Sequence, residues 1–149
     1  MHQRPTILIL LLLVSVTLIG CQRDASSVDR SAGQPSNIKL AADGEPAVEL
    51  MINYGDGSEK RFTQIPFEDG MTVSAALQHA AKHPRGITFE KSGAGEAALL
   101  TRIDDLANQA GADGDNWLYR VNGKLATKSF DAYVLAAGDV ILWTFEKYE

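Results

Sequence analysis

The sequence has very little cysteine: one residue, Cys21, in 149. A lone cysteine cannot close an internal disulfide, so the chain is not a disulfide-stapled scaffold and needs an apolar core. Positive charge is also scarce, with 14 Lys and Arg against 19 Asp and Glu and a formal net charge of −5. Binding to nucleic acid or to anionic lipid through charge requires clustered basic residues. The charge balance therefore argues against both kinds of partner.

Long apolar runs are absent as well. The longest, from Ile7 to Ile19, follows Arg4 and is shorter than the roughly 20 apolar residues that cross a bilayer as a helix. It has the length and the positive leading end of a secretory signal peptide. The residues that follow, Leu18-Ile19-Gly20-Cys21, resemble the lipobox of bacterial lipoproteins. The resemblance implies that residues 1–20 are cleaved and that Cys21 carries the lipid anchor. The alternative is a stray thiol after an ordinary signal peptide.

The residues after Cys21 predict a spacer. Residues 21–46 are rich in Ser, Ala, Asp, Gly, Gln and Pro and offer little apolar surface, so we expect a flexible linker. In Gram-negative lipoproteins an Asp after the lipidated cysteine commonly retains the protein at the inner membrane. Gln22 therefore favours the outer membrane of a bacterial cell envelope. Residues 47–149 have a typical size for one domain.

The start of this domain predicts a hairpin and a helix. From Val48 to Tyr54 every second residue is apolar, which is the period of a half-buried strand. The turn sequence Gly55-Asp56-Gly57-Ser58 then leads to a second strand over residues 60–67. Thr72 can cap a helix that ends before Pro84.

The rest of the domain predicts further strands. Short strands are expected around Ile87 and within residues 97–106. The strand from Trp117 to Val121 ends at Asn122-Gly123, a tight hairpin turn, and a last strand covers residues 140–145. A hairpin, one helix and then three or more strands, written β-β-α-β-β-β, predict an α+β fold with a β-grasp-like sheet.

Three segments of the C-terminal third form a recognisable pattern: Trp117-Leu118-Tyr119-Arg120-Val121-Asn122-Gly123-Lys124, Tyr133-Val134-Leu135 and Gly138-Asp139-Val140-Ile141-Leu142-Trp143. In this order they resemble the transcobalamin-like C-terminal domain. Residues 72–77, TVSAAL, stand where that family usually has TVLDAL. The resemblance implies a small β-grasp-like domain of the kind that is common on bacterial surfaces.

The same resemblance implies a ligand. In the animal vitamin B12 carriers this domain closes over one face of cobalamin, while a separate helical barrel holds the other. By position, Trp117, Lys124 and Leu125 would face the corrin. The sequence shows no helical barrel, so we expect only weak binding.

The residues themselves allow a ligand face or a core. Trp117, Tyr119 and Trp143 could stack on a planar amphipathic ligand, with Asn116 and Asn122 supplying polar groups. The same aromatic residues could instead fill a small core, with Asn122 serving only as a turn residue.

Other constellations are weaker. His79 and His83 have a spacing that can hold a metal, but no third ligand is evident. The acidic residues Asp104, Asp105, Asp113 and Asp115 lack the spacing and closing Glu of a calcium loop, so we expect a solvated loop and no metal site. No nucleophile with a partnering base is apparent, which predicts a non-enzymatic protein without a cofactor.

Two functions remain open. The first is a binding module for cobalamin or a similar planar nutrient. The second is a module that docks another envelope protein through a sheet edge or an aromatic patch.

The lipobox generates a direct test of anchoring. Mass spectrometry of the mature protein should find acylated Cys21 at the N-terminus, and Cys21→Ser should release the protein from membrane fractions. A mature N-terminus at another residue, or an unchanged membrane fraction for Cys21→Ser, would contradict the prediction.

Overall fold

The computed structural model describes residues 38–148 except residue 112. The expected signal peptide, Cys21 and residues 22–37 of the expected linker lie outside these residues. None of the helices that are described is long and apolar enough to cross a membrane.

A hairpin opens the fold, as the sequence predicts. β1 (Ala47–Asn53) pairs antiparallel with β2 (Glu59–Pro66). Val48, Leu50 and Ile52 of β1 are buried, because the two-residue period of a strand turns them all to one face.

One α-helix follows. α1 (Val73–Ala81) begins at Thr72, whose Oγ1 accepts a hydrogen bond from the Ala75 N–H at 3.3 Å. Val73, Ala76, Leu77 and Ala80 form its buried face. The cap at Thr72 and the end of the helix before Pro84 both agree with the sequence prediction.

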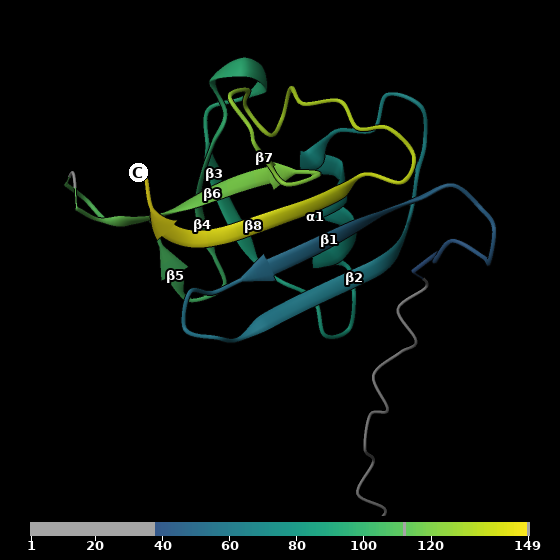
Figure 1. The fold of residues 1–149 in the computed structure, drawn as a ribbon, viewed down its shortest axis with the longest axis horizontal. Coiled ribbons are helices and arrows are strands. Elements are labelled where there is room, and N and C mark those ends of the chain that lie inside the picture. Colours follow the sequence, from purple (N-terminus) through teal and green to yellow (C-terminus); the bar gives the residue numbers. More distant parts are fainter. Residues whose placement is uncertain (1–37, 112, 149) are drawn as a thin grey trace, which may run out of the picture. The chain divides into compact units, whose positions relative to one another are not determined.

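The C-terminal strands complete the main sheet. β6 (Asp115–Val121) turns through Asn122 and Gly123 into the short β7 (Lys124–Leu125). Both turn residues have positive φ, 51° and 78°, which Asn and Gly tolerate best. β8 (Val140–Lys147) then runs antiparallel to β6 and parallel to β1, which gives the strand order β2-β1-β8-β6-β7 (Figure 1).

The intervening segment forms a second, separate sheet. β3 (Phe89–Ser92), β4 (Leu99–Ile103) and β5 (Leu106–Ala107) pair in that order, and a 3-10 turn, η1 (Gly95–Ala97), lies between β3 and β4. The mixed α and β class is as expected. The division into two sheets is not, because short apolar runs do not reveal which strands they pair with.

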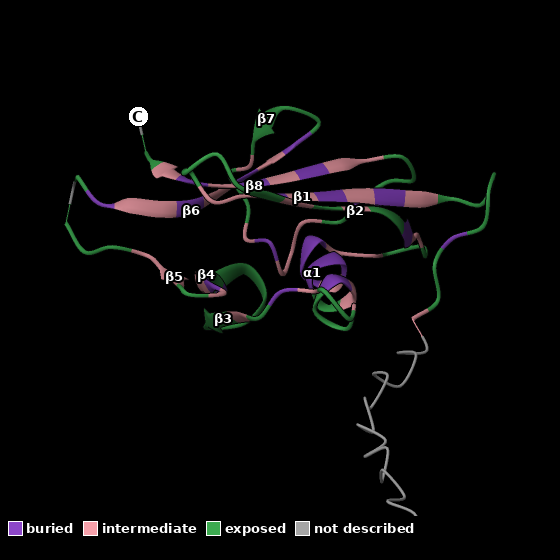
Figure 2. Cartoon of the chain, turned by 90° about the horizontal axis from the view of Figure 1, so that it is seen from below, coloured by how far each residue is buried: buried purple, intermediate pink, exposed green. Residues whose placement is uncertain are grey.

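The layers leave one face of the main sheet open. α1 and the β3-β4-β5 sheet cover the same face, and the core lies between them and the main sheet (Figure 2). In the described part of the chain no element covers the opposite face, where Met51, Leu118 and Leu142 are half-buried.

Packing begins before the expected domain boundary at Ala47. Ala41 is buried, and its N–H donates to the Gln64 carbonyl at 3.0 Å. His79 Nε2 lies 2.9 Å from the Lys39 carbonyl oxygen, which fixes this segment to α1. The packed part of the chain therefore includes residues that we expected in the linker. A single short run, Ile38 to Ala42, gave too little apolar periodicity to show it in the sequence.

Aromatic side chains of β6 and β8 fill the core beneath the sheet. Trp117 is 4% exposed and Trp143 is 2% exposed. The Trp117 ring lies 5.2 Å from the ring of Phe145, and the Trp143 ring lies 4.8 Å from that of Tyr119, centre to centre. These residues do not form the exposed stacking face that a surface site for a planar ligand would need.

A single carboxylate joins the two sheets. Asp104, in the turn between β4 and β5, accepts hydrogen bonds from the Tyr54 hydroxyl at 2.6 Å, from Lys60 Nζ at 3.0 Å and from the Thr88 N–H at 2.8 Å. Burial opposes its ionisation, but these hydrogen bonds outweigh that effect and lower the pKa of Asp104. Asp104 is thus a structural residue and not part of a solvated loop.

Burial of Trp117 predicts a large effect on stability. Trp117→Ala should lower the free energy of unfolding by about 3–5 kcal/mol, because it removes a buried ring and leaves a cavity. Urea denaturation measures this change. A loss below about 1 kcal/mol would show that the ring is not part of the core.

The hydrogen bonds to Asp104 predict a pH dependence. Asp104 has a φ of 49°, a backbone conformation that Asn also tolerates. Asp104→Asn should therefore lower the free energy of unfolding by about 1–3 kcal/mol at pH 7 through its weaker hydrogen bonds. The folded pKa lies below the unfolded value, so the carboxylate stabilises fully above about pH 4 and loses its effect as the pH falls through the folded value. Urea unfolding at several pH values should show the difference between wild type and variant shrinking below about pH 4. A difference that is unchanged down to pH 2 would contradict the assignment.

Candidate functional site

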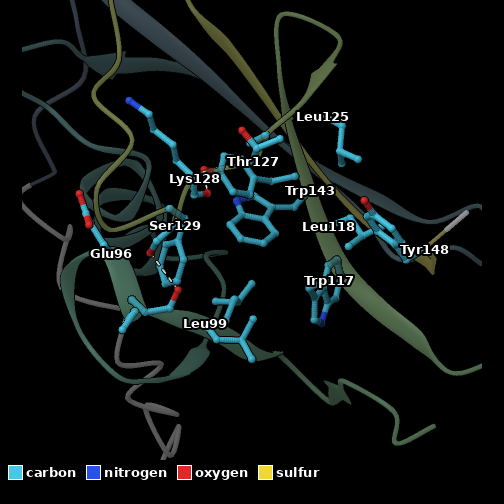
Figure 3. A pocket seen from close by; sticks show the side chains of 16 residues that line it. Glu96, Leu99, Trp117, Leu118, Leu125, Thr127, Lys128, Ser129, Trp143 and Tyr148 are labelled. Carbon is cyan, nitrogen blue, oxygen red and sulfur yellow. Dashed lines mark hydrogen bonds between the residues drawn. The ribbon is translucent and has the colours of Figure 1, made fainter. Parts of the chain in front are cut away.

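A pocket opens at the edge of the main sheet where β6 passes β4 and the segment after β7. Its volume is about 330 Å³. We call it the edge pocket, and it is lined by Glu96, Ala97, Ala98, Leu99, Leu100, Trp117, Leu118, Tyr119, Leu125, Ala126, Thr127, Lys128, Ser129, Phe130, Trp143 and Tyr148 (Figure 3). This volume is at the lower end of the range for small-molecule sites.

The buried aromatic residues form the floor. Tyr119 and Trp143 stand on neighbouring strands, and Phe130 packs edge-on against Trp143 at 5.6 Å between ring centres. The Tyr119 hydroxyl donates to the Lys128 carbonyl at 2.6 Å. Burial, with a smaller contribution from Tyr133, raises the pKa of Tyr119, so its hydroxyl stays protonated at neutral pH.

The two tryptophan side chains differ in their hydrogen bonds. Trp117 Nε1 donates to the Leu106 carbonyl at 2.9 Å. Trp143 Nε1 is buried and has no hydrogen-bond partner among the described residues. An unsatisfied buried donor costs about 1–3 kcal/mol, so the fold keeps this group at the pocket at a loss of stability.

Part of the rim of the edge pocket is apolar. Leu99, Leu125 and Tyr148 line it, and all three are among the exposed large apolar side chains of the described residues. Figure 3 shows Leu99 on one side of Trp117, and Leu118 and Tyr148 together on the other. A cluster of exposed apolar side chains around a concavity is typical of a binding site.

Hydrogen bonds connect the two walls of the pocket. Ser129 Oγ donates to the Ala98 carbonyl at 2.8 Å, and Asp131 accepts from Lys91 Nζ and from the Gly95 N–H. The Lys91 ammonium holds the pKa of Asp131 below its usual range. The wall that carries Leu99 is therefore fixed to the wall that carries Lys128.

The structure brings together four of the seven residues that the sequence suggested for ligand binding: Trp117, Tyr119, Leu125 and Trp143. Lys124 is exposed and does not line the pocket. Asn116, near the start of β6, donates to the carbonyl of Gly114 just before the strand, at 2.8 Å. Asn122 donates to Asp139 and accepts from the Val140 N–H, so it holds a turn. These last two side chains have structural roles because each already bonds to a neighbouring loop.

Sequence reasoning missed the rest of the rim, chiefly Leu99, Lys128 and Tyr148. The adjacent pair Leu99-Leu100 carried a signal, because neighbouring strand residues face opposite sides and only one can be buried. Leu100 is buried and Leu99 is 57% exposed. Lys128 and Tyr148 had no comparable signal.

No group of three or more His, Cys, Asp or Glu that could hold a metal occurs within the described residues. The Nδ1 of His83 accepts from the Arg85 N–H, and the His83 ring packs on Phe62. His79, as shown above, contacts the Lys39 carbonyl. Each imidazole therefore has a structural contact.

Solved structures share this fold at low sequence identity. One is a suspected metal-binding protein from Ruminococcus gnavus ATCC 29149, with a TM-score of 0.53 and 15% identity; the match covers 70% of this chain and 100% of the other. Another is haptocorrin in complex with Cbi, with a TM-score of 0.54 and 16% identity; the match covers 74% of this chain and 27% of haptocorrin. These likenesses establish the fold.

No curated protein matches the sequence. A model of a protein family matches residues 70–147. These residues include α1, all strands from β3 to β8 and every residue of the edge pocket except Tyr148. The chain belongs to the family described as a domain of unknown function, DUF4430.

Proposed function

We propose that this protein is a binding module that takes up cobalamin or a similar planar, amphipathic ligand at the edge pocket. The observation that carries the proposal is that three exposed apolar side chains, Leu99, Leu125 and Tyr148, line the same pocket as buried aromatic side chains. Apolar contact area with a few polar groups is the usual composition of small-molecule sites.

The size of the pocket determines how such a ligand would bind. A corrin with its side chains is larger than a cavity of about 330 Å³. The macrocycle would therefore rest on the apolar rim, and only one of its peripheral groups would enter the pocket. Contact with one face of the ligand gives weak affinity, in the millimolar to micromolar range of about −4 to −8 kcal/mol.

The likeness to haptocorrin in complex with Cbi supports this ligand class. The matched region is only 27% of haptocorrin, so a second protein would have to cover the other face of the ligand for strong binding. We propose that the module presents or transfers its ligand and performs no catalysis.

The proposed setting follows from the lipobox. A lipid on Cys21 would hold the module at a bacterial membrane, outside the cytoplasm, with the segment after Cys21 as a tether. Gln22 favours the outer membrane in a Gram-negative host. A ligand passing through the envelope would then reach a binding surface confined to the membrane.

A second candidate function is docking of another envelope protein, favoured by the open face of the main sheet. Half-buried Met51, Leu118 and Leu142 lie on this face, with the ion pair of Arg120 and Glu146 beside them. Pairing of a foreign strand with β6 is less favourable. The Trp117 N–H is already bonded to Asn108 Oδ1 at 2.9 Å, and the Asp115 N–H to Gln109 Oε1 at 3.2 Å.

Two leucine variants test the site. Leu99→Ala should weaken binding of cyanocobalamin about fivefold, because it removes apolar contact area at the rim. Leu40→Ala is the matched control, since Leu40 is 49% exposed, close to the 57% of Leu99, and does not line the edge pocket. Isothermal titration calorimetry of both variants and of the wild type provides the measurement.

Equal losses of affinity in the two leucine variants would show that the ligand does not bind at the edge pocket. No heat of binding for the wild type at millimolar cyanocobalamin would reject the cobalamin proposal and leave docking of an envelope protein as the better account.

A further inference from the structure

We infer that Trp143 is a specificity residue of the edge pocket, whose indole N–H donates a hydrogen bond to a neutral carbonyl, such as a carboxamide, on the ligand. The inference rests on the proposed function in placing the ligand at this pocket. It adds the chemical group that the pocket selects.

Trp143 lies on β8, is buried and lines the edge pocket. On β8, Ile141, Trp143 and Phe145 all face the core. Trp143 lies opposite Tyr119 on β6, and both line the pocket. Figure 3 shows the indole of Trp143 inside the pocket, between Trp117 and the Thr127-Lys128 segment.

The indole N–H of Trp143 has no hydrogen-bond partner among the described residues. Trp143 is 2% exposed, and its Nε1 is one of three buried side-chain N or O atoms without a partner in the described part of the chain. Trp117, on the same floor, has its Nε1 bonded to a carbonyl. Buried polar groups are normally paired, so an unpaired donor at a pocket calls for an acceptor beyond the described residues, which a ligand can supply.

The pocket wall allows an acceptor to enter. Nε1 is buried beneath the pocket wall, so a ligand must displace part of that wall. The segment from Leu125 to Lys128 is largely exposed, and β7 is paired with β6 at only two positions. The backbone of this segment is held to Tyr119 by the Ala126 N–H and by the Lys128 carbonyl. An acceptor must therefore enter past the exposed side chains of Thr127 and Lys128.

The surroundings favour a neutral acceptor. The floor consists of aromatic and aliphatic side chains, and Lys128, one of two charged residues that line the pocket, is exposed. A carboxylate that reached Nε1 would lose its hydration without gaining a buried cation. An amide carbonyl loses less and gains the same hydrogen bond.

The two tryptophans provide a test with an internal control. In a ¹⁵N-labelled full chain in detergent, the two indole N–H signals are assigned by the loss of one in Trp143→Phe. Titration with propionamide, a small neutral amide, should shift the Trp143 signal progressively and leave the Trp117 signal nearly fixed. Propionate at the same concentrations should shift the Trp143 signal much less.

Three outcomes would overturn the inference: no shift at Trp143 with propionamide, equal shifts at both tryptophans, or an equal response to propionate. The titration also separates the inference from the proposed function. Cyanocobalamin that binds without moving the Trp143 signal overturns the inference alone. A propionamide shift at Trp143 without any binding of cyanocobalamin supports the inference and rejects the cobalamin proposal.

The Trp143→Phe variant supplies a second measurement. It keeps an aromatic ring and removes the donor, so affinity for propionamide should fall about tenfold, the loss typical of one hydrogen bond. Leu40→Ala, outside the pocket, should retain the wild-type affinity. An unchanged affinity in a folded Trp143→Phe would overturn the inference, and if this variant does not fold, the wild-type titrations decide.

Discussion

Aromatic packing beneath β6 and β8 is the interaction on which both the fold and the site depend. Trp117, Tyr119, Trp143 and Phe145 occupy facing positions of the two strands and turn to the same side. Their rings join the main sheet to the layer below it, and those of Trp117, Tyr119 and Trp143 also line the edge pocket. The same buried residues thus stabilise the domain and line the cavity.

This dual role explains why a core residue can still take part in binding. A buried ring contributes contact area without an entropic cost on binding, since its rotamer is already fixed. Trp117 and Trp143 differ in what their indole nitrogens meet: a carbonyl for Trp117 and no partner within the described residues for Trp143. A fold that satisfies one donor and leaves the other unpaired gives up stability at the second position, and ligand binding is one way to recover it.

Polar contacts hold the layers in register around this core. Asp104 collects donors from the first hairpin and from the segment after α1, and Ser129 joins the two walls of the pocket. These bonds link residues far apart in sequence, with separations of 50, 44, 16 and 31 positions. Such links make the pocket a product of the tertiary structure, since neither wall has a defined shape alone.

The sequence by itself determined the local structure. The alternation in Val48–Tyr54, the cap at Thr72 and the Asn122-Gly123 turn each follow from interactions within a few residues, and the structure confirms them. Only the tertiary structure decided which strands share a sheet, whether Trp117 faces solvent or core, and that Leu99 and Tyr148 meet at one rim. Periodicity shows that one face of a strand is apolar, but not what covers that face. The position of the second sheet against β6, which no local pattern encodes, settles both the burial of the tryptophans and the opening beside them.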